Sequence, residues 1–84
     1  MYSLVYSDIA LKQLEKMDNS ARKWVISALE RCRIRPYAHV KKLVGNSYFR
    51  LRVGDYRIIL EIRNEQFVIL VIKVGHRGNI YETI

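Results

Sequence analysis

The fold is decided by residues 48–63, which read Tyr-Phe-Arg-Leu-Arg-Val-Gly-Asp-Tyr-Arg-Ile-Ile-Leu-Glu-Ile-Arg. Apolar and polar side chains alternate on both sides of Gly54-Asp55, and this period of two is typical of half-buried strands. A two-residue loop that contains glycine suits a type I′ or II′ turn, and glycine in the first position favours II′. The stretch therefore predicts an antiparallel hairpin in which Arg52 pairs with Arg57.

The two faces of the predicted hairpin differ in their chemistry. One face should belong to the core, and it consists of Phe49, Leu51, Val53, Tyr56, Ile58, Leu60 and Ile62. The other face carries Tyr48, Arg50, Arg52, Arg57 and Glu61. Like charges that face each other across strands are unfavourable. Two interpretations follow. The first is a solvated sheet face. The second is a surface that binds a polyanion, because each guanidinium group can donate two parallel hydrogen bonds to phosphate oxygens.

Positive charge is concentrated in the middle of the chain. The sequence holds 15 Lys and Arg residues against 8 Asp and Glu, a net charge of +7. Residues 31–60 contain eight of the basic residues and one of the acidic residues, so the whole excess lies there. A field of one sign attracts nucleic acid, acidic protein or an anionic membrane. Neither a convincing basic amphipathic helix nor a lipid anchor supports a membrane partner.

Length and composition predict a single domain over residues 1–84. Half of the residues are hydrophobic, so the chain should fold rather than stay disordered. The N-terminus lacks the apolar segment of a signal peptide, and the longest apolar run, residues 67–72, is too short to span a bilayer. The single cysteine, Cys32, cannot form an internal disulfide. These features favour the cytoplasm.

Two consecutive helices are predicted after a short N-terminal strand at residues 2–6. The first helix begins at Ser7 or Asp8, and the second follows the break at residues 18–20 and ends before Pro36. The apolar stripe of the second helix consists of Trp24, Val25, Ala28, Leu29 and Cys32, which are interpreted as core residues.

The C-terminal half supplies the rest of the sheet. Residues 36–47 are predicted to be a basic connection, and Asn64-Glu65 a turn after the hairpin. Residues 67–74 are almost wholly apolar, as in a central strand that is buried on both faces. The order β-α-α-β-β-β predicts an α+β fold, in which a helical hairpin packs on one face of a mostly antiparallel twisted sheet.

Several catalytic classes have no support in the sequence. His39 and His76 are far apart and Cys32 belongs to the helix stripe, so no metal site is predicted. The glycines match no phosphate-binding loop, and no Ser-His-Asp spacing is present. We therefore expect neither a metal nor a cofactor.

Three motifs resemble the RelE branch of the RelE/ParE toxin superfamily. They are Lys-Lys-Leu-Val-Gly at 41–45, Tyr-Phe-Arg-Leu-Arg-Val-Gly-Asp-Tyr-Arg-Ile-Ile at 48–59 and Val-Ile-Lys-Val-Gly-His-Arg at 71–77, with Tyr81 beyond. Each motif alone is loose, but their order and spacing are specific. The resemblance covers nearly the whole chain, and it implies a ribosome-dependent mRNA endoribonuclease that acts in the A site. It also implies inhibition by a RelB-like antitoxin, with operator DNA bound only through the antitoxin complex.

The resemblance also implies roles for individual residues. Arg57 matches the family arginine that holds the scissile phosphate, and Arg77 matches the one that protonates the leaving 5′ oxygen. Tyr81 matches the tyrosine that stacks on or orients the substrate, and Arg50 completes the expected catalytic set. The residues expected to bind RNA are Arg52, Lys41, Lys42, His76 and Tyr48.

One departure from the family pattern concerns the general base. The family strand carries two lysines, one of them the presumed base, whereas Tyr48 and Arg50 occupy those positions here. Guanidinium titrates above about 12, so arginine is a poor base. His76 is one replacement, because the ordinary pKa of histidine is near neutral. Charge stabilisation by the arginines and positioning by the ribosome are the other explanation.

Two alternatives use the same fold. A ParE-like toxin inhibits gyrase by binding a protein, and a degenerate toxin acts only in a corepressor complex with its antitoxin and DNA. The set Arg50, Arg57, Arg77 and Tyr81 argues against gyrase inhibition, because such inhibition needs no cluster of this kind. The missing lysines leave the degenerate toxin open.

Overall fold

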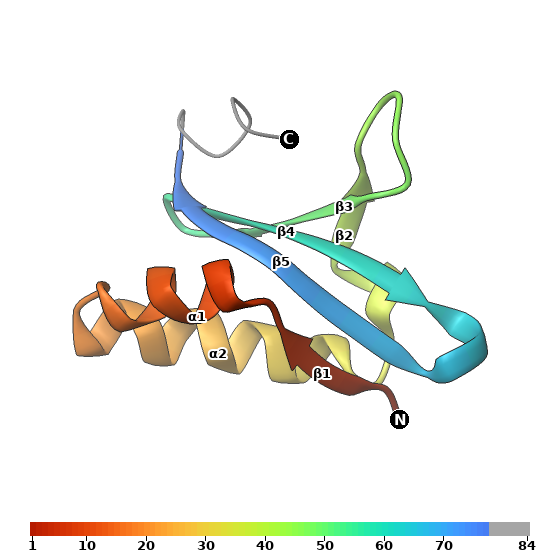
Figure 1. Cartoon of the computed structure of the whole chain (residues 1–84), viewed down its shortest axis with the longest axis horizontal. Coiled ribbons are helices and arrows are strands. Elements are labelled where there is room, and N and C mark those ends of the chain that lie inside the picture. Colours follow the sequence, from red (N-terminus) through yellow and green to blue (C-terminus); the bar gives the residue numbers. More distant parts are fainter. Residues whose placement is uncertain (78–84) are drawn as a thin grey trace.

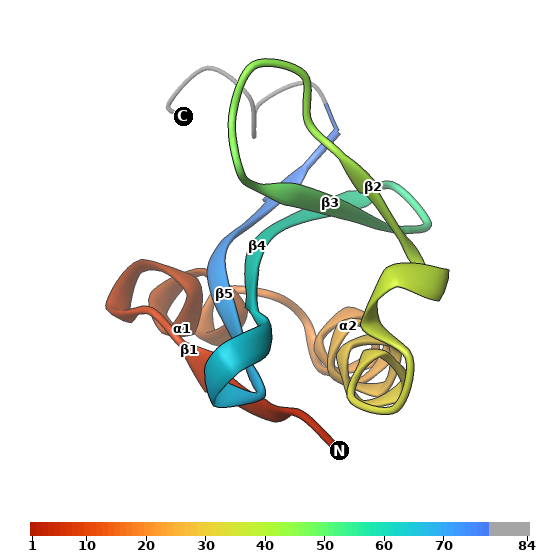
Figure 2. The same cartoon turned by 90° about the vertical axis from the view of Figure 1, so that its right-hand side faces the viewer.

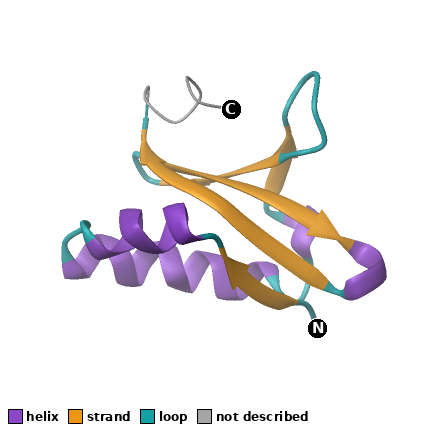
Figure 3. Cartoon of the chain, viewed as in Figure 1, coloured by secondary structure: helices purple, strands orange, loops and turns teal. Residues whose placement is uncertain are grey.

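In the computed structural model, which describes residues 1–77, two helices lie on one side of a five-stranded sheet (Figure 1). The elements are β1 (Ser3–Tyr6), α1 (Asp8–Glu15), α2 (Asn19–Cys32), η1 (Pro36–Ala38), β2 (Val40–Lys42), β3 (Phe49–Val53), β4 (Tyr56–Arg63), η2 (Asn64–Gln66) and β5 (Val68–His76). The strand order is β1-β5-β4-β3-β2, with β1 parallel to β5 and the other pairs antiparallel. Helices and strands form separate layers (Figure 3), which confirms the α+β class.

Both helices begin with a side-chain cap, and together they confirm the predicted helical hairpin. Ser7 Oγ accepts a hydrogen bond from the backbone N–H of Ala10 at 3.0 Å, and Asp18 Oδ1 accepts one from Ala21 at 3.3 Å. These caps satisfy N–H groups that lack a partner inside the helix. Within residues 1–77, neither helix is long and apolar enough to cross a membrane.

The hairpin of β3 and β4 has the predicted register and turn. Arg52 pairs with Arg57, and Arg50 pairs with Ile59. Gly54 has a φ of +56°, whereas Asp55 has no positive φ. A positive φ at the first loop residue alone is the pattern of a type II′ turn.

The connection at residues 36–47 contains a strand that the sequence analysis missed. Val40, Lys41 and Lys42 of β2 pair with Leu51, Arg50 and Phe49 of β3. Three residues are too few to show a period of two, and lysine is uncommon in strands. Short edge strands with lysine are common in proteins, because they discourage pairing with other chains. The sheet therefore has one strand more than predicted, and it is mixed.

The strand β5 is central, as predicted, but the prediction that it is buried on both faces was wrong. Ile69, Val71 and Val74 are buried toward the helices, while Val68, Leu70 and Ile72 are only half-buried. The reason is that α1 and α2 both lie below the sheet in Figure 1 and share one core with Ile69, Val71 and Val74, while no helix within residues 1–77 covers the other side. Figure 2 shows the sheet as curved, with α1 beside β5 and α2 below β3 and β2. Phe67 lies outside the strand, in a left-handed turn position with a φ of +53°.

The core lies between the helices and the sheet. Its buried members are Ala10, Leu14, Val25, Ala28, Leu29, Cys32, Leu51, Val53, Ile58, Leu60, Ile69, Val71 and Val74. Phe49, Tyr56 and Ile62 pack against them, which confirms the predicted core face of the hairpin. The interpretation of Trp24 as a core residue was wrong, because its side chain is 55% exposed. It lies at the edge of the α2 stripe and contacts the turn between β3 and β4.

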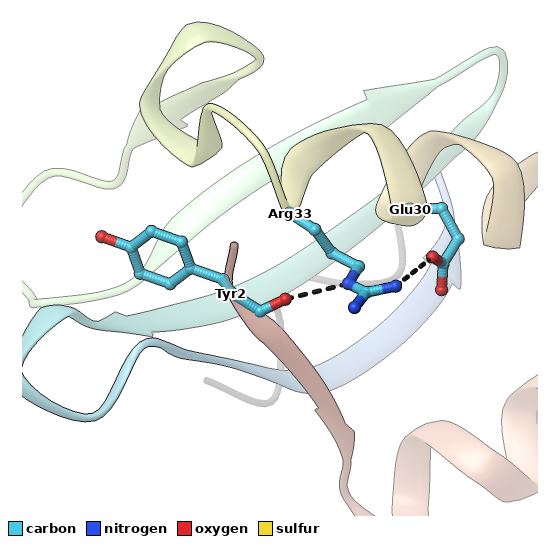
Figure 4. A network of polar contacts seen from close by, with 3 residues as sticks. All are labelled: Tyr2, Glu30 and Arg33. Carbon is cyan, nitrogen blue, oxygen red and sulfur yellow. Dashed lines mark hydrogen bonds and ion pairs between the residues drawn. The ribbon is translucent and has the colours of Figure 1, made fainter.

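Arg33 ties the N-terminal strand to the end of α2 (Figure 4). Its Nε donates to the backbone oxygen of Tyr2 at 2.9 Å, and its NH1 donates to Glu30 Oε1 at 2.8 Å. The backbone N–H of Tyr2 donates in turn to the Arg33 oxygen at 2.9 Å. The ion pair itself contributes little because it is exposed. The backbone hydrogen bonds hold the start of the chain against α2, just before β1 joins β5.

Candidate functional site: a basic face of the sheet

The sheet face opposite the helices carries most of the expected site residues. Paired residues in a sheet project to the same face. One row across β2, β3, β4 and β5 consists of Lys41, Arg50, Ile59 and Lys73, and the neighbouring row of Arg52, Arg57 and Gly75. These two rows belong to the side of the sheet away from the helices, which is the upper side in Figure 1, and are called the basic face below. Their pairing brings cations from four strands onto one surface.

Arg57 is the most enclosed cation of the basic face. It is 8% exposed, and its NH1 donates to the backbone oxygens of Gly54 and Tyr56, at 3.0 Å each. The expectation that Arg57 lies on a solvated face was therefore wrong. A buried charge is tolerated when hydrogen bonds satisfy it, and the carbonyl groups of the turn do so here. The same bonds hold the guanidinium in one orientation before any ligand arrives, which is the condition for strong stabilisation of an anion.

Arg52 and Arg57 are direct cross-strand neighbours. Arg52 is exposed, whereas Arg57 is buried. Their repulsion lowers the stability of the free protein, but it also raises the positive potential at this place. The nearest acid on β4, Glu61, pairs with Arg63 rather than with these arginines. Glu61 therefore does not neutralise the charges of Arg52 and Arg57.

Two of the residues expected to bind RNA lie at the edge of the basic face or beyond it. Tyr48 precedes β3 and continues the alternation of Arg50 and Arg52, so it belongs to the same side of the sheet. Lys42 pairs with Phe49, which packs on the core, so Lys42 belongs to the helix side. The structure brings Lys41 to the basic face and leaves Lys42 on the other side.

His76 is also separated from the basic face. It pairs with Tyr56, and the two rings meet edge to face with centroids 5.5 Å apart. Tyr56 packs against the core, so both rings lie on the helix side. They line a cavity of about 320 Å³ together with Gln13 and Met17. The ring of His76 therefore lies on the face opposite the Arg57 guanidinium.

Arg77 is tied to the same turn as Arg57. Its backbone N–H donates to the Asp55 oxygen at 2.7 Å, while its side chain is exposed. The structure therefore places Arg77 at the end of the sheet where Arg57 is held. Tyr81, the remaining residue of the expected catalytic set, lies outside the described residues.

Lys73 is a cation of the basic face that the sequence analysis did not identify as a site residue. It pairs with Ile59, next to Arg50 in the same row. The only sequence signal was a single lysine inside the apolar run Val-Ile-Lys-Val at 71–74. Strict alternation would have placed that lysine in the core, so its position depends on a local irregularity of β5.

Cys32 is a core residue, as predicted, with 1% of its surface exposed. Burial raises the pKa of its thiol, and the nearby charge of Arg31 opposes this effect. The thiol stays protonated and inert at neutral pH. Among residues 1–77, no three His, Cys, Asp or Glu side chains are grouped so that they could hold a metal ion.

Taken together, a two-helix layer on a mixed sheet and a cluster of arginines and lysines on the opposite sheet face define a small α+β protein with a positively charged surface. The chain belongs to the RelE/ParE toxin superfamily of type II toxin-antitoxin systems, on its RelE branch. The family described as "ParE toxin of type II toxin-antitoxin system, parDE" matches residues 4–81.

Similar proteins of known class support the RelE branch. A protein described as a putative RelE-like toxin, from Escherichia coli, is 29% identical over 79 residues, which cover 90% of this chain and 83% of that protein. Toxin RelE3 of Methanocaldococcus jannaschii is 28% identical over 85 residues, which cover 94% of both chains. Among solved structures, a chain of the intact E. coli RelBE toxin-antitoxin complex matches with a TM-score of 0.79 and 27% identity, covering 94% of this chain and all of that one.

Proposed function

We propose that this toxin is a ribosome-dependent mRNA endoribonuclease that cleaves in the A site and is inhibited by a RelB-like antitoxin. One observation carries the proposal: Arg57 is buried on the basic face, directly opposite Arg52, and the turn carbonyls fix its guanidinium. A stable fold has no need of two facing arginines. A phosphate group bound between them would relieve their repulsion.

The proposed reaction uses the RNA's own 2′-OH as the nucleophile. The 2′ oxygen forms a bond to phosphorus, the bond to the 5′ oxygen breaks, and the products carry a 2′,3′-cyclic phosphate and a 5′-OH. The 2′-OH must lose its proton, the phosphate oxygens need charge stabilisation, and the leaving oxygen must gain a proton. The proton of the 2′-OH passes to water, Arg57 stabilises the phosphate, and Arg77 donates a proton to the leaving oxygen and regains one from water. This chemistry requires neither a metal nor a cofactor.

The ribosome holds the mRNA in a geometry that the small site cannot impose alone. Arg50 and Arg52 contact the phosphates beside the scissile one, and Tyr48 and Lys41 extend the contact along the mRNA strand. The geometry of the 2′-OH is then set by the mRNA in the A site, which accounts for a site without a lysine at the family position. His76 and Lys42 lie on the helix side and take no part in this proposal. The mRNA substrate also places the protein in the cytoplasm.

The proposed inhibitor is an antitoxin with acidic and apolar segments. The similar E. coli toxin is known in a complex named RelBE, with its antitoxin. In this chain the basic face provides the charge for such a partner, and the half-buried apolar residues of β5 on the same side provide the apolar contact. Operator DNA would be bound through the antitoxin.

The test is induced expression followed by mapping of mRNA 5′ ends. We expect new ends in translated messages, and none in the same messages when their ribosome-binding sites are removed. Arg57→Ala should abolish the cuts. His76→Gln is the matched control from the opposite face and should cut like the unmodified toxin. An unchanged map of 5′ ends on induction would refute the proposal.

Gyrase inhibition is a second candidate, because the family match is to the ParE toxin description. A ParE-like toxin would act by binding a protein, and plasmid supercoiling would fall on induction while mRNA remained uncut. The same induced cultures therefore separate the two functions. Growth without inhibition and with neither effect would favour the degenerate toxin, which acts only in its antitoxin complex.

A further inference from the structure

A β-bulge in β5 controls where Lys73 lies. The pairing of β4 with β5 shifts between Ile59 and Leu60: Ile59 pairs with Lys73, while Leu60 pairs with Val71. Ile72 is therefore an extra residue without a partner in this ladder. An extra residue of this kind bends the strand and changes the direction of the side chains that follow it.

The bulge moves Lys73 from the core side to the basic face. Ile69 and Val71 are fully buried on the helix side, so regular alternation would put Lys73 among the core residues. With one residue inserted, Val74 becomes the next core residue, 2% exposed, and Lys73 turns to the opposite side. Burying a lysine in the core without a partner would cost free energy. The bulge avoids this cost because it turns Lys73 away from the core.

Side chains of α1 and of its N-cap residue hold the backbone on both sides of Lys73. Ser7 Oγ donates to the Ile72 oxygen at 2.6 Å, and Gln13 Oε1 accepts from the Val74 N–H at 2.6 Å. The strand β1 pairs with β5 only as far as Val71, so these side chains satisfy backbone groups that lack a neighbouring strand there. The bulge is therefore a fixed feature of the fold, and the position of Lys73 is fixed with it.

On the basic face, Lys73 lies one strand away from Arg57 and two strands away from Arg50, the two arginines that the proposed function uses. It shares a row with Arg50, on either side of Ile59, and it is the diagonal neighbour of Arg57, whose direct partner is Gly75. Diagonal neighbours in a sheet are about 7–8 Å apart, which is within the reach of a lysine side chain for a shared ligand. Because Gly75, the direct partner of Arg57, has no side chain, it does not obstruct the approach of the Lys73 side chain to Arg57.

We propose that Lys73 is an RNA-contacting residue of this toxin, whose ammonium group binds the phosphate backbone together with Arg57 and Arg50. This inference rests on the proposed ribonuclease function and adds a residue from within β5 to the site residues of β2, β3 and β4 and to Arg77. The ammonium group of lysine acts as a point charge with a flexible stem, so it tolerates small shifts of the phosphate. The paired arginines supply the directional contacts.

Single-turnover cleavage on programmed ribosomes tests this inference. Lys73→Met should lower kcat/KM about tenfold or more, because it removes a charged hydrogen bond to the substrate. Lys73→Arg should retain most of the activity. The matched control is Lys23→Met, which removes the same charge from an exposed position on α2. Thermal unfolding of each variant shows that the comparison is made on folded protein.

A second measurement keeps the test independent of small changes in stability. Each phosphate contact contributes about 0.7 to the slope of log affinity against log salt for single-stranded nucleic acid. Lys73→Met should therefore bind single-stranded RNA with a slope reduced by about that amount, and Lys23→Met with an unchanged slope. If Lys73→Met matches the unmodified toxin in rate and slope while Arg57→Ala is inactive, the inference is overturned and the proposed function stands. If Arg57→Ala is also fully active, the role proposed for Arg57 is wrong, and if the unmodified toxin cleaves no mRNA on programmed ribosomes, the proposed function itself is wrong.

Discussion

At the scale of single residues, Arg57 combines a structural and a chemical role. Its guanidinium joins the two carbonyl groups of the β3–β4 turn, and the same group faces the basic surface. Sequence alternation predicted the face on which Arg57 lies, but not its burial. Burial depends on hydrogen bonds from the side chain to the turn backbone, which a period of two does not encode.

This double role predicts a distinctive pattern of defects. Arg57→Ala should lower the free energy of unfolding by about 1–3 kcal/mol, because two carbonyl oxygens lose a charged donor. Leu60→Ala, in the core, should cost about 2–5 kcal/mol. Arg57→Lys keeps the charge but loses the planar fork, so cleavage should fall even where stability is largely recovered. Urea unfolding and ribosome cleavage of the same samples check this.

The outcome for Arg57→Ala decides whether the turn contacts matter. A variant as stable as the unmodified toxin would show that the two carbonyl hydrogen bonds contribute nothing. A variant less stable than Leu60→Ala would show that Arg57 supports more of the fold than its turn.

Cys32 gives a prediction for alkaline pH. Burial raises the pKa of its thiol in the folded state, so the unfolded chain loses this proton at a lower pH than the folded chain does. The stabilising effect is complete below the ordinary thiol pKa and is lost as pH rises through the folded-state value. The free energy of unfolding should therefore decrease above the ordinary thiol range, with a slope of at most about 1.4 kcal/mol per pH unit.

The comparison variant for this prediction is Cys32→Ala. Burial also raises the pKa of the Tyr6 hydroxyl, with a further increase from Glu30, and this group contributes the same sign of slope in both proteins. Urea unfolding between pH 8 and pH 10 should give a steeper decline for the unmodified chain than for Cys32→Ala. Parallel curves would show that the thiol does not titrate differently in the two states.

At the scale of elements, the structure shows which features a local pattern can reveal. The hairpin was predictable because one face of each strand is buried and a glycine sets the turn. β2 was not, since three residues carry no readable period. The bulge at Ile72 was not predictable either, because it is held by Ser7 and Gln13 from a distant helix. The parallel pairing of β1 with β5 likewise depends on segments more than sixty residues apart.

The position of Trp24 shows the same limit. Its place in the apolar stripe of α2 predicted a core residue, whereas its indole lies across the β3–β4 turn. A Cβ atom on Gly54 would lie 2.8 Å from Trp24 Cη2 and 2.9 Å from Cζ3. Helix α2 therefore contacts the turn that holds Arg57, and Gly54 is required both for its positive φ and for the space that Trp24 occupies.

This contact predicts an energetic coupling between α2 and the turn. Gly54→Ala should destabilise the fold because it meets the indole and because a left-handed residue with a side chain costs about 1 kcal/mol. Combined with Trp24→Ala, the same change should cost less, since the steric conflict is removed. A double-mutant cycle from urea unfolding should give a coupling of about 0.5–3 kcal/mol. Additive effects would show that the ring moves aside without cost.

At the scale of the whole molecule, the sheet has the residues that stabilise the fold on one side and the residues of the proposed site on the other. Its helix side holds the continuous core, and its open side holds the cations. Substitutions in the core should therefore change mainly folding, and substitutions of the exposed cations should change mainly binding. Arg57 and Ile59 are buried members of the basic face, so substitutions there should also change folding. Because the positive charge is concentrated on one face, the electric field of the free toxin steers anionic partners toward that face.

This asymmetry predicts how the antitoxin associates. An acidic partner steered by the basic face should bind with an association rate that falls steeply as salt increases. Arg52→Glu reverses an exposed charge on that face and should lower the association rate and its salt dependence. Lys23→Glu makes the same change on the exposed side of α2 and should leave both nearly unchanged. Stopped-flow association with a purified antitoxin at several salt concentrations makes the measurement. If the two variants associate alike, or if salt has no effect on the unmodified toxin, then the antitoxin is recognised through the apolar surface and not through the basic face.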